Sequence, residues 1–342
     1  MNKTLIALAL AAVAGGANAA DFSPAVNGGD NTNAIYSTDS ANLFLGGRAE
    51  FRGDFDGKES GEDIDGSMED SSRIRLNVGG TTQITDTLSG FGFYEGEQKT
   101  GDDSDFEQRY AYVGLKGSYG ALSFGRQDTA NVQLSNMSDV AIFTGSQKSF
   151  IGYGDEQQTN NIAYTGQFDN LSIKASAILG GDDNEDGYGI SAIYKLPYNI
   201  GLGLGYAGGD SKDAAGNDTG DAEQFMAGAN YAVGGFYTAL TYTKGKINND
   251  NDFEGYEFAA KYKFENNFSV IGAYQYQEVE NKEFSNFYEL TGAYDFNKHL
   301  QAYLAYKFNE LDKGDRASLE DLDDLRTEDA EDTIRLGLKY TF

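Results

Sequence analysis

The residues of this chain that could carry chemistry are few, and their types exclude most catalytic arrangements. The sequence has no cysteine and a single histidine, His299. Disulfide bonds and thiolate chemistry are therefore ruled out, and a histidine-based triad or a zinc site is nearly so. His299 lies in a predicted turn, where we expect a solvated side chain. We predict no enzymatic activity and no cofactor.

One segment imitates part of a calcium-binding loop. Asp182, Asn184 and Asp186 precede Gly187, but Ile193 stands at the twelfth position, where an EF-hand requires glutamate. No helices are predicted on either side. We interpret the segment as an exposed acidic loop and predict no metal site, although dense carboxylates can attract divalent cations loosely. The formal net charge of −28 also argues against a nucleic acid partner.

The first 19 residues have the composition of an export signal. Lys3 gives a short positive start, an apolar and Ala-rich stretch follows as far as Gly16, and Ala17-Asn18-Ala19 matches a cleavage site. The apolar stretch is shorter than the roughly 20 residues of a membrane-spanning helix. We predict a signal peptide over residues 1–19.

The elements that must position the remaining polar residues are strands with one apolar side. In the last eleven residues, apolar and polar side chains alternate with period two, the apolar set being Ile334, Leu336, Leu338, Tyr340 and Phe342. The same pattern recurs along the chain, and the apolar faces end in Tyr or Phe. A soluble β-sandwich would need large aliphatic residues in a second sheet, whereas aromatic ends suit the two interfaces of a bilayer.

We predict about sixteen such strands, each long enough to cross a bilayer with tilt. They span 42–53, 72–84, 88–97, 106–116, 121–126, 161–168, 171–179, 187–196, 200–208, 222–231, 236–246, 253–264, 268–278, 284–296, 300–311 and 332–342. Short and long connections alternate, with one exception at 279–283. This alternation is typical of a transmembrane antiparallel β-barrel with short periplasmic turns and long outer loops. The fold class is therefore all-β, and a barrel of this size leaves an aqueous channel. A predicted inner face of small residues, such as Gly201, Gly203 and Gly205, suits a water-filled pore.

Several motifs give the sequence a family resemblance. The segment from Arg109 to Arg126 resembles the hairpin that precedes the long third loop of the general, non-specific trimeric porins of Gram-negative outer membranes. The hairpin from Arg75 to Gly92, the strand Thr159–Tyr164 and the ending Leu336–Phe342 resemble further parts of that family. The resemblance covers nearly the whole mature chain.

The resemblance implies a sixteen-stranded homotrimeric barrel whose third loop folds into the pore and forms an eyelet, where wall arginines face loop carboxylates. Arg75 and Arg109 match two wall arginines, and Arg73 shares the inward face of Arg75. Asp139 matches one loop carboxylate. Arg48 and Arg52 are further inward candidates. The alternative is that these arginines form ordinary salt bridges to neighbouring strands.

The sequence departs from the family at this eyelet. Ile142 stands where a glutamate is expected, and the third wall arginine, expected just before Asn160, is missing. The resemblance further implies that Arg126 holds the second loop of a neighbouring subunit, with Asp102, Asp103 and Asp105 as acidic partners. A local salt bridge is the other reading. Phe342 matches the terminal aromatic residue that the barrel-assembly machinery recognises.

The domain organisation follows from these features. We predict a signal peptide at 1–19, an N-terminal extension at 20–33 that departs from the family, and a porin barrel at 34–342. The extension is either a periplasmic tail or a segment that enters and narrows the pore.

The predicted function is passive diffusion of small hydrophilic solutes and ions through a homotrimer in lipid and lipopolysaccharide. The acidic loops predict mild cation selectivity. Alternatives are a sugar- or oligosaccharide-specific channel and a surface adhesin or phage receptor on the same barrel. A phospholipase, which needs a Ser/His pair, is disfavoured.

Overall fold

The computed structural model describes residues 33–55, 58–59, 62–63, 67–100, 105–181, 185–212, 216–311 and 331–342. The predicted signal peptide and all but the last residue of the predicted extension lie outside the described residues, as do Asp102 and Asp103. In the described part of the chain, no helix is long and apolar enough to cross a membrane.

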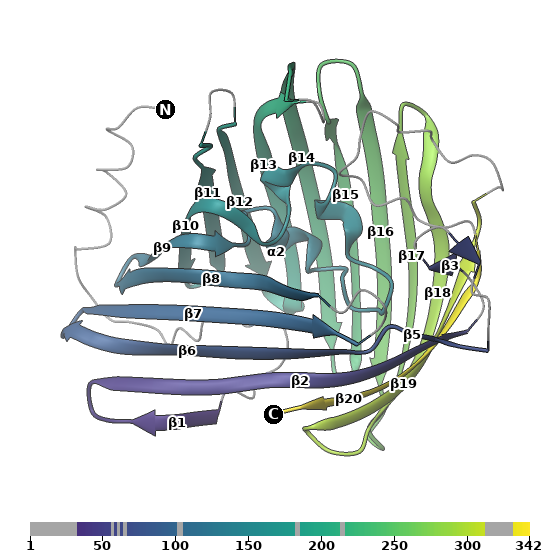
Figure 1. Ribbon diagram of the computed structural model, residues 1–342, viewed down its shortest axis with the longest axis horizontal. Helices are drawn as coiled ribbons and strands as arrows, with labels where there is room; N and C mark the ends of the chain where they lie inside the picture. The colour runs from purple at the N-terminus through teal and green to yellow at the C-terminus, as the bar shows by residue number, and fades with distance from the viewer. Residues whose placement is uncertain are drawn as a thin grey trace.

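Sixteen of the described strands form a closed antiparallel β-barrel, in which each strand pairs with the next (Figure 1). They are β2 (Ala41–Phe55), β6 (Arg73–Thr85), β7 (Leu88–Lys99), β8 (Phe106–Gly117), β9 (Gly120–Gln127), β10 (Gln158–Phe168), β11 (Leu171–Ile178), β12 (Gly187–Leu196), β13 (Ile200–Lys212), β14 (Asp218–Val233), β15 (Phe236–Lys246), β16 (Asp252–Lys263), β17 (Phe268–Val279), β18 (Lys282–Asp295), β19 (Leu300–Asn309) and β20 (Thr333–Thr341). The first and last of them close the barrel, because β2 pairs with β20 from Arg48↔Thr341 to Phe55↔Ile334.

Beyond the end of β20, β1 (Asn33–Ser37) covers the same edge of β2. Asn33 pairs with Leu45, while Phe342 exchanges two backbone hydrogen bonds with Gly47, of 2.9 and 3.0 Å. One edge of β2 is thus paired with β20 and Phe342 along its second half and with β1 along its first half. Three further short strands lie between β2 and β6, namely β3 (Lys58–Glu59), β4 (Glu62–Asp63) and β5 (Glu69–Asp70).

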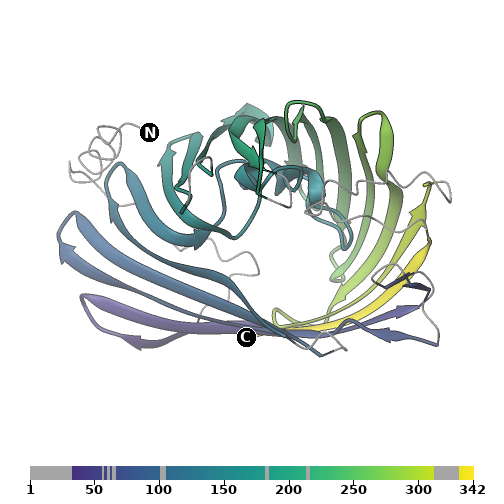
Figure 2. The same cartoon turned by 45° about the horizontal axis from the view of Figure 1, so that its top comes forward.

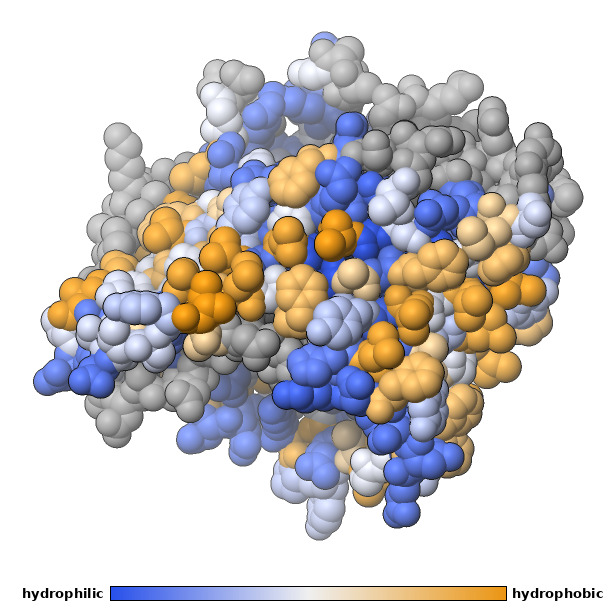
Figure 3. All heavy atoms as spheres, turned by 60° about the horizontal axis from the view of Figure 1, so that its bottom comes forward, coloured by the Kyte–Doolittle hydropathy of each residue, from blue (hydrophilic) through white to orange (hydrophobic). Residues whose placement is uncertain are grey.

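The two faces of the strands differ as the period-two pattern predicts. On β20, the outward Leu336, Leu338 and Tyr340 are 43%, 45% and 48% exposed. Figure 3 shows hydrophobic residues spread across one outer side of the barrel, with hydrophilic residues gathered along its lower rim. In a bilayer, such an apolar band meets lipid, and closure of the ring leaves no open strand edge.

The long third loop, between β9 and β10, lies inside the barrel. It contains α2 (Val132–Ser135), η1 (Ser146–Lys148) and η2 (Gly152–Gly154), and in Figure 2 this teal segment lies within the ring of strands. Buried loop residues pack against the inner wall in two apolar clusters. One joins Phe150 and Ile151 to Phe253, and the other joins Leu134 and Met137 to Met226.

The small inner residues of β13 make room for this loop rather than for water. A Cβ atom on Gly203 would lie 2.4 Å from Cδ2 of Leu134, and one on Gly205 would lie 2.7 Å from Cδ1 of the same side chain. Both distances are too short for ordinary contacts. The expectation that this face lines open water is therefore wrong for Gly203 and Gly205, because α2 packs against them.

Candidate pore constriction

A ladder of arginines faces the inside of the barrel from three adjoining strands. Arg48 and Arg52 come from β2, Arg73 and Arg75 from β6, and Arg335 from β20. Alternation within each strand turns them all to the inner face, and pairing sets Arg48 opposite Arg75. Arg335 was not predicted as a site residue, although it lies on the charged face of the last strand.

Buried carboxylates stand between these arginines. Oε2 of Glu50 lies 2.9 Å from Nε of Arg73 and 3.8 Å from Nε of Arg48, and Oε1 of Glu50 accepts a 3.0 Å hydrogen bond from the hydroxyl of Tyr303. Glu97 contacts Nε of Arg75, and the side chains of Glu50 and Glu97 are each 4% exposed. Cross-strand pairs of opposite charge stabilise a sheet, so these carboxylates offset the repulsion between neighbouring arginines.

At the loop end of β2, Asp54 binds Arg335 through two bonds. Nε of Arg335 lies 2.6 Å from Oδ1 of Asp54, and its second nitrogen lies 2.7 Å from Oδ2. The guanidinium group also lies 4.7 Å from the ring centre of Phe143, a residue of the third loop. This cation–π contact joins the arginine ladder to the loop.

Arg109 reaches the third loop from β8. The pairing of β7 with β8 shifts register between Glu95 and Gly96, so Arg109 sits at a β-bulge. Bulges re-aim side chains, and here Arg109 donates from Nε to Glu95 at 3.0 Å and lies 3.7 Å from Oε2 of Glu156. Glu156 is therefore the loop carboxylate that meets a predicted wall arginine.

Asp139, the predicted loop carboxylate, contacts a residue of its own loop. Its Oδ2 lies 3.7 Å from Nζ of Lys148, which also contacts Glu156 at 2.9 Å and donates to the carbonyl of Gly145 at 2.6 Å. In the structure Asp139 is thus paired with a lysine of its own loop. Sequence reasoning overlooked Lys148, which lies nine residues further along.

Burial and charge set the protonation of this loop cluster. Burial alone raises the pKa of Glu156, but Lys148 and Arg109 outweigh it and hold that pKa below its usual range. For Asp139 burial prevails over Lys148, so its pKa is raised. Burial lowers the pKa of Lys148, yet Glu156 and Asp139 together raise it above the ordinary value. Lys148 is therefore a fixed cation bridging two carboxylates.

Two wall carboxylates hold the tip of the third loop by its backbone. Glu289 on β18 accepts hydrogen bonds from the amides of Ile142 and Phe143, of 2.8 and 2.9 Å, and Glu257 on β16 accepts one of 2.7 Å from Gly145. The loop lacks a glutamate at Ile142, and at this point a wall glutamate binds the loop instead. Gly145 has φ +104°, and a Cβ there would lie 2.4 Å from the carboxyl carbon of Asp139, so only glycine fits.

The two remaining predicted residues make contacts within the subunit. Arg126 donates from Nε to the carbonyl of Arg109 at 3.2 Å. Phe342 stacks on Tyr340 with ring centres 6.0 Å apart.

Comparison with known proteins agrees with this geometry. A family model described as Gram-negative porin matches residues 6–314. Outer membrane protein U of Vibrio parahaemolyticus is 33% identical and porin-like protein L of Photobacterium profundum is 31% identical, each over the full length of both chains.

Solved structures share the fold. OmpF of Salmonella typhi, in a complex with daunomycin, superposes with a TM-score of 0.77 at 21% identity, covering 91% of this chain and all of the other. OmpT of Vibrio cholerae, in its trimer form, gives 0.69 at 18% identity, covering 89% of this chain and all of the other. With its sixteen-stranded barrel, its inward loop and full-length relatives of this kind, the chain belongs to the Gram-negative porins, which are channels of the outer membrane.

Proposed function

We propose that the chain forms a homotrimer of water-filled pores through which small hydrophilic solutes and ions diffuse passively, with a mild preference for cations and without any catalytic step. The observation that carries this proposal is the eyelet. Arginines of β2, β6 and β20 face the lumen from the barrel wall. The third loop lies in the same lumen and carries the carboxylates of Asp139 and Glu156. Opposed charges across a narrow aqueous gap create a transverse field that orients polar solutes.

The arginines are the proposed pore-lining residues, together with Asp139. Arg48, Arg52, Arg73, Arg75 and Arg109 are balanced in part by the buried carboxylates of Glu50, Glu95 and Glu97. This balance weakens the anion preference that five arginines would otherwise give. The acidic loop end then favours cations within a Debye length of about 8 Å.

Distribution of the outward residues supports a trimer. On β2 and β6 the exposed outward side chains are mostly aliphatic, including Leu43, Leu45, Ile74, Leu76 and Val78. On β12 to β20 exposed tyrosines and phenylalanines are frequent, as at Tyr188, Tyr256, Tyr288 and Phe308. Because aromatic belts mark lipid contact, we assign the aliphatic side to the subunit interface.

Other partners follow from the resemblance alone. We propose that the signal peptide at 1–19 directs export, that Phe342 is recognised by the barrel-assembly machinery, and that lipopolysaccharide surrounds the outer rim. Arg126 is proposed to hold the second loop of a neighbouring subunit. The extension at 20–33 is proposed to be either a periplasmic tail or a segment that narrows the pore, and unchanged conductance after deletion of residues 21–33 would reject the second of these.

Planar-bilayer recording of the refolded protein tests the main proposal. We expect stepwise openings in groups of three, and a reversal potential in a salt gradient that indicates weak cation preference. A folded, heat-modifiable barrel without conductance would contradict it.

An inward aromatic cluster favours a second candidate, a channel that prefers sugars. The ring of Phe93 lies 5.5 Å from that of Tyr112, 6.2 Å from that of Tyr110 and 6.3 Å from that of Phe44. Together with Phe91 most of these rings line a cavity of about 160 Å³ beside Asp128. Aromatic faces and carboxylates are the surfaces that sugars use. Concentration-dependent block by maltose that Phe93→Leu abolishes, and outward Phe258→Leu does not, would favour this candidate over unselective diffusion.

A further inference from the structure

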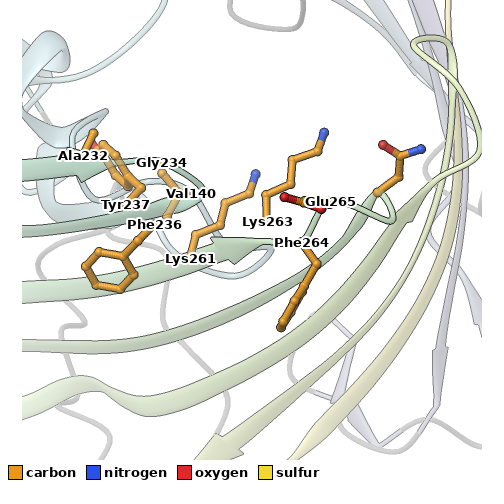
Figure 4. Close-up of a pocket in the computed structure, with 11 residues that line it drawn as sticks. Val140, Ala232, Gly234, Phe236, Tyr237, Lys261, Lys263, Phe264 and Glu265 are labelled. Atoms are coloured by element: carbon orange, nitrogen blue, oxygen red, sulfur yellow. The ribbon is translucent and has the colours of Figure 1, made fainter.

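A cavity of about 650 Å³ lies inside the barrel at the end where the short turns are (Figure 4). Val140 of the third loop lines it on one side, and the strand ends around Ala232, Phe236 and Asn267 line the other. A solute that passes the tip of the third loop toward the turns therefore meets this cavity next.

Two lysines of β16 project into the cavity. Lys261 and Lys263 are two residues apart and extend to the same side of the strand, opposite to Phe264, as Figure 4 shows. Successive residues on one face of a strand lie about 7 Å apart, a spacing that lets two ammonium groups contact one oxyanion between them. Asn267, in the adjoining turn, adds an amide to the lining.

The neighbouring carboxylates neutralise this group only in part. Asp295 on β18 lies 2.7 Å from Nζ of Lys263 and accepts a 2.6 Å hydrogen bond from Gln301. Its charge is also close enough to interact with Lys261 and with Lys339 of β20. Glu265 also lines the cavity, and Glu50, which interacts with Lys339, is shared with Arg48 and Arg73. The cations on this inner wall still outnumber these carboxylates.

The loop end of the same strands has the opposite character. The rims of β15 and β16 pair Lys244 with Glu254 at 3.8 Å and Lys246 with Asp252 at 3.7 Å. Further along, Glu278, Glu280 and Glu283 flank the turn between β17 and β18. The outer rim of β15 to β18 is therefore acidic at the loop end, whereas the inner wall at the turn end is basic.

We propose that Lys261 and Lys263, assisted by Lys339, form a binding site for small multivalent oxyanions, such as phosphate esters or polycarboxylates, on the turn side of the constriction. The site rests on the proposed diffusion channel and names a solute class that it retains. Lysine binds phosphate and carboxylate oxygens as a compact point charge, and the cavity is large enough for a solute of that kind. Because the turns of such barrels face the periplasm, the site acts on anions arriving from that side.

Side-specific block by citrate tests the site. Citrate at millimolar concentration is added to one chamber of a planar bilayer that holds the protein, and its apparent blocking constant is measured from each side. Channel orientation is read from an Asp250→Cys variant of the loop end, since the chain has no other cysteine for an impermeant thiol reagent to modify. We expect block from the turn side to need several-fold less citrate than block from the loop side.

The variant Lys261→Gln/Lys263→Gln should weaken turn-side block at least fivefold and leave loop-side block unchanged. Lys244→Gln/Lys246→Gln removes the same charge at the opposite end of the neighbouring strand and should leave turn-side block unchanged. Equal block from both sides in the wild type, or unchanged block in the first variant, would overturn the site.

Titration calorimetry of citrate into the detergent-solubilised protein separates this proposal from the channel itself. We expect binding heat in the wild type and a marked loss in Lys261→Gln/Lys263→Gln. If the barrel conducts no ions yet binds citrate in this pattern, diffusion is refuted and the site stands. If it conducts but the two proteins give the same heats, the site is refuted and diffusion stands.

Discussion

Individual side chains in the constriction act as bridges between wall and loop. Lys148 joins Asp139 to Glu156, and Arg109 joins Glu156 to Glu95. A chain of alternating charge thus runs from β8 into the third loop. Removing a member leaves its neighbours buried without a counter-charge, so the loop rather than the barrel is the part that such changes loosen.

Lys148→Met should detach this part of the loop. Removing one partner of a buried ion pair lowers the free energy of unfolding by about 3–5 kcal/mol, because the remaining charge stays desolvated. We expect voltage-induced closure at a lower threshold and a lower thermal unfolding temperature. The double variant Lys148→Met/Glu156→Gln removes one of the two stranded carboxylates and should recover part of the loss. A single variant that gates like the wild type would show that Lys148 does not hold the loop.

Glu156 should make the loop sensitive to acid. Its folded-state pKa is below the ordinary value of 4.5, so its stabilisation is complete above pH 4.5 and disappears as pH falls through the lowered pKa. We expect the closing threshold of the wild type to fall on acidification below pH 4.5. Comparison with Glu156→Gln isolates this contribution, since Asp139 remains in both proteins. If the closing threshold falls equally with acidification in the wild type and in Glu156→Gln, Glu156 is excluded as the cause.

At the scale of elements, the third loop is held by strands far away in the sequence. Glu257 on β16 and Glu289 on β18 bind its backbone, and Leu134 of α2 fills the space left by the glycines of β13. Backbone amides do not depend on side-chain identity, which explains how Ile142 can occupy the position where a glutamate is expected.

Glu289→Gln should free the loop tip. A carboxylate accepts from both amides of Ile142 and Phe143, whereas a glutamine has one acceptor oxygen and turns an NH₂ group toward the second amide. An unsatisfied buried donor costs about 1–3 kcal/mol. We expect noisier openings and a lower closing threshold in single-channel records. Glu283→Gln, at the loop end of the same strand, is the matched control, and equal behaviour of the two variants would contradict this role.

The elements were largely predictable from sequence, but the interior was not. The predicted spans 187–196 and 253–264 agree with β12 and β16 to within one residue, because alternation with one lipid-facing side is a strong local signal. Loop contacts lie far apart in sequence, such as Ser138 with Thr241 at 2.7 Å, and no local pattern encodes them. For the same reason Arg335 and Lys148 were missed, and the contact of Asp139 with Lys148 was not predicted.

At the scale of the whole molecule, the outward surface has two sides. The aliphatic side on β2 and β6 and the aromatic side on β12 to β20 are each about as exposed, since Leu76 is 47% and Leu304 is 54% exposed. Their difference is chemical, and it fits one side that meets another subunit and one that meets lipid.

Leu76→Asn and Leu304→Asn form a matched pair for this assignment. Both add the same polar group to an outward strand position. Only the first should convert the oligomer to monomers on unheated gels and in light scattering, because only β6 lies in the proposed interface. Trimers in both variants, or dissociation in both, would refute the assignment of the interface.

The strand pairing around β2 also brings the two ends of the barrel close together. From Phe55 to Gly47 the partners are β20 and Phe342, and from Leu45 to Asn42 they are the residues of β1, which run in the same direction. Together β20 and β1 form one strand with a nick opposite Gly46. A single linking residue between Phe342 and Asn33 would make the barrel a closed covalent circle. Its start could then be moved to another short turn, such as that at Asp169, with every strand keeping its neighbours.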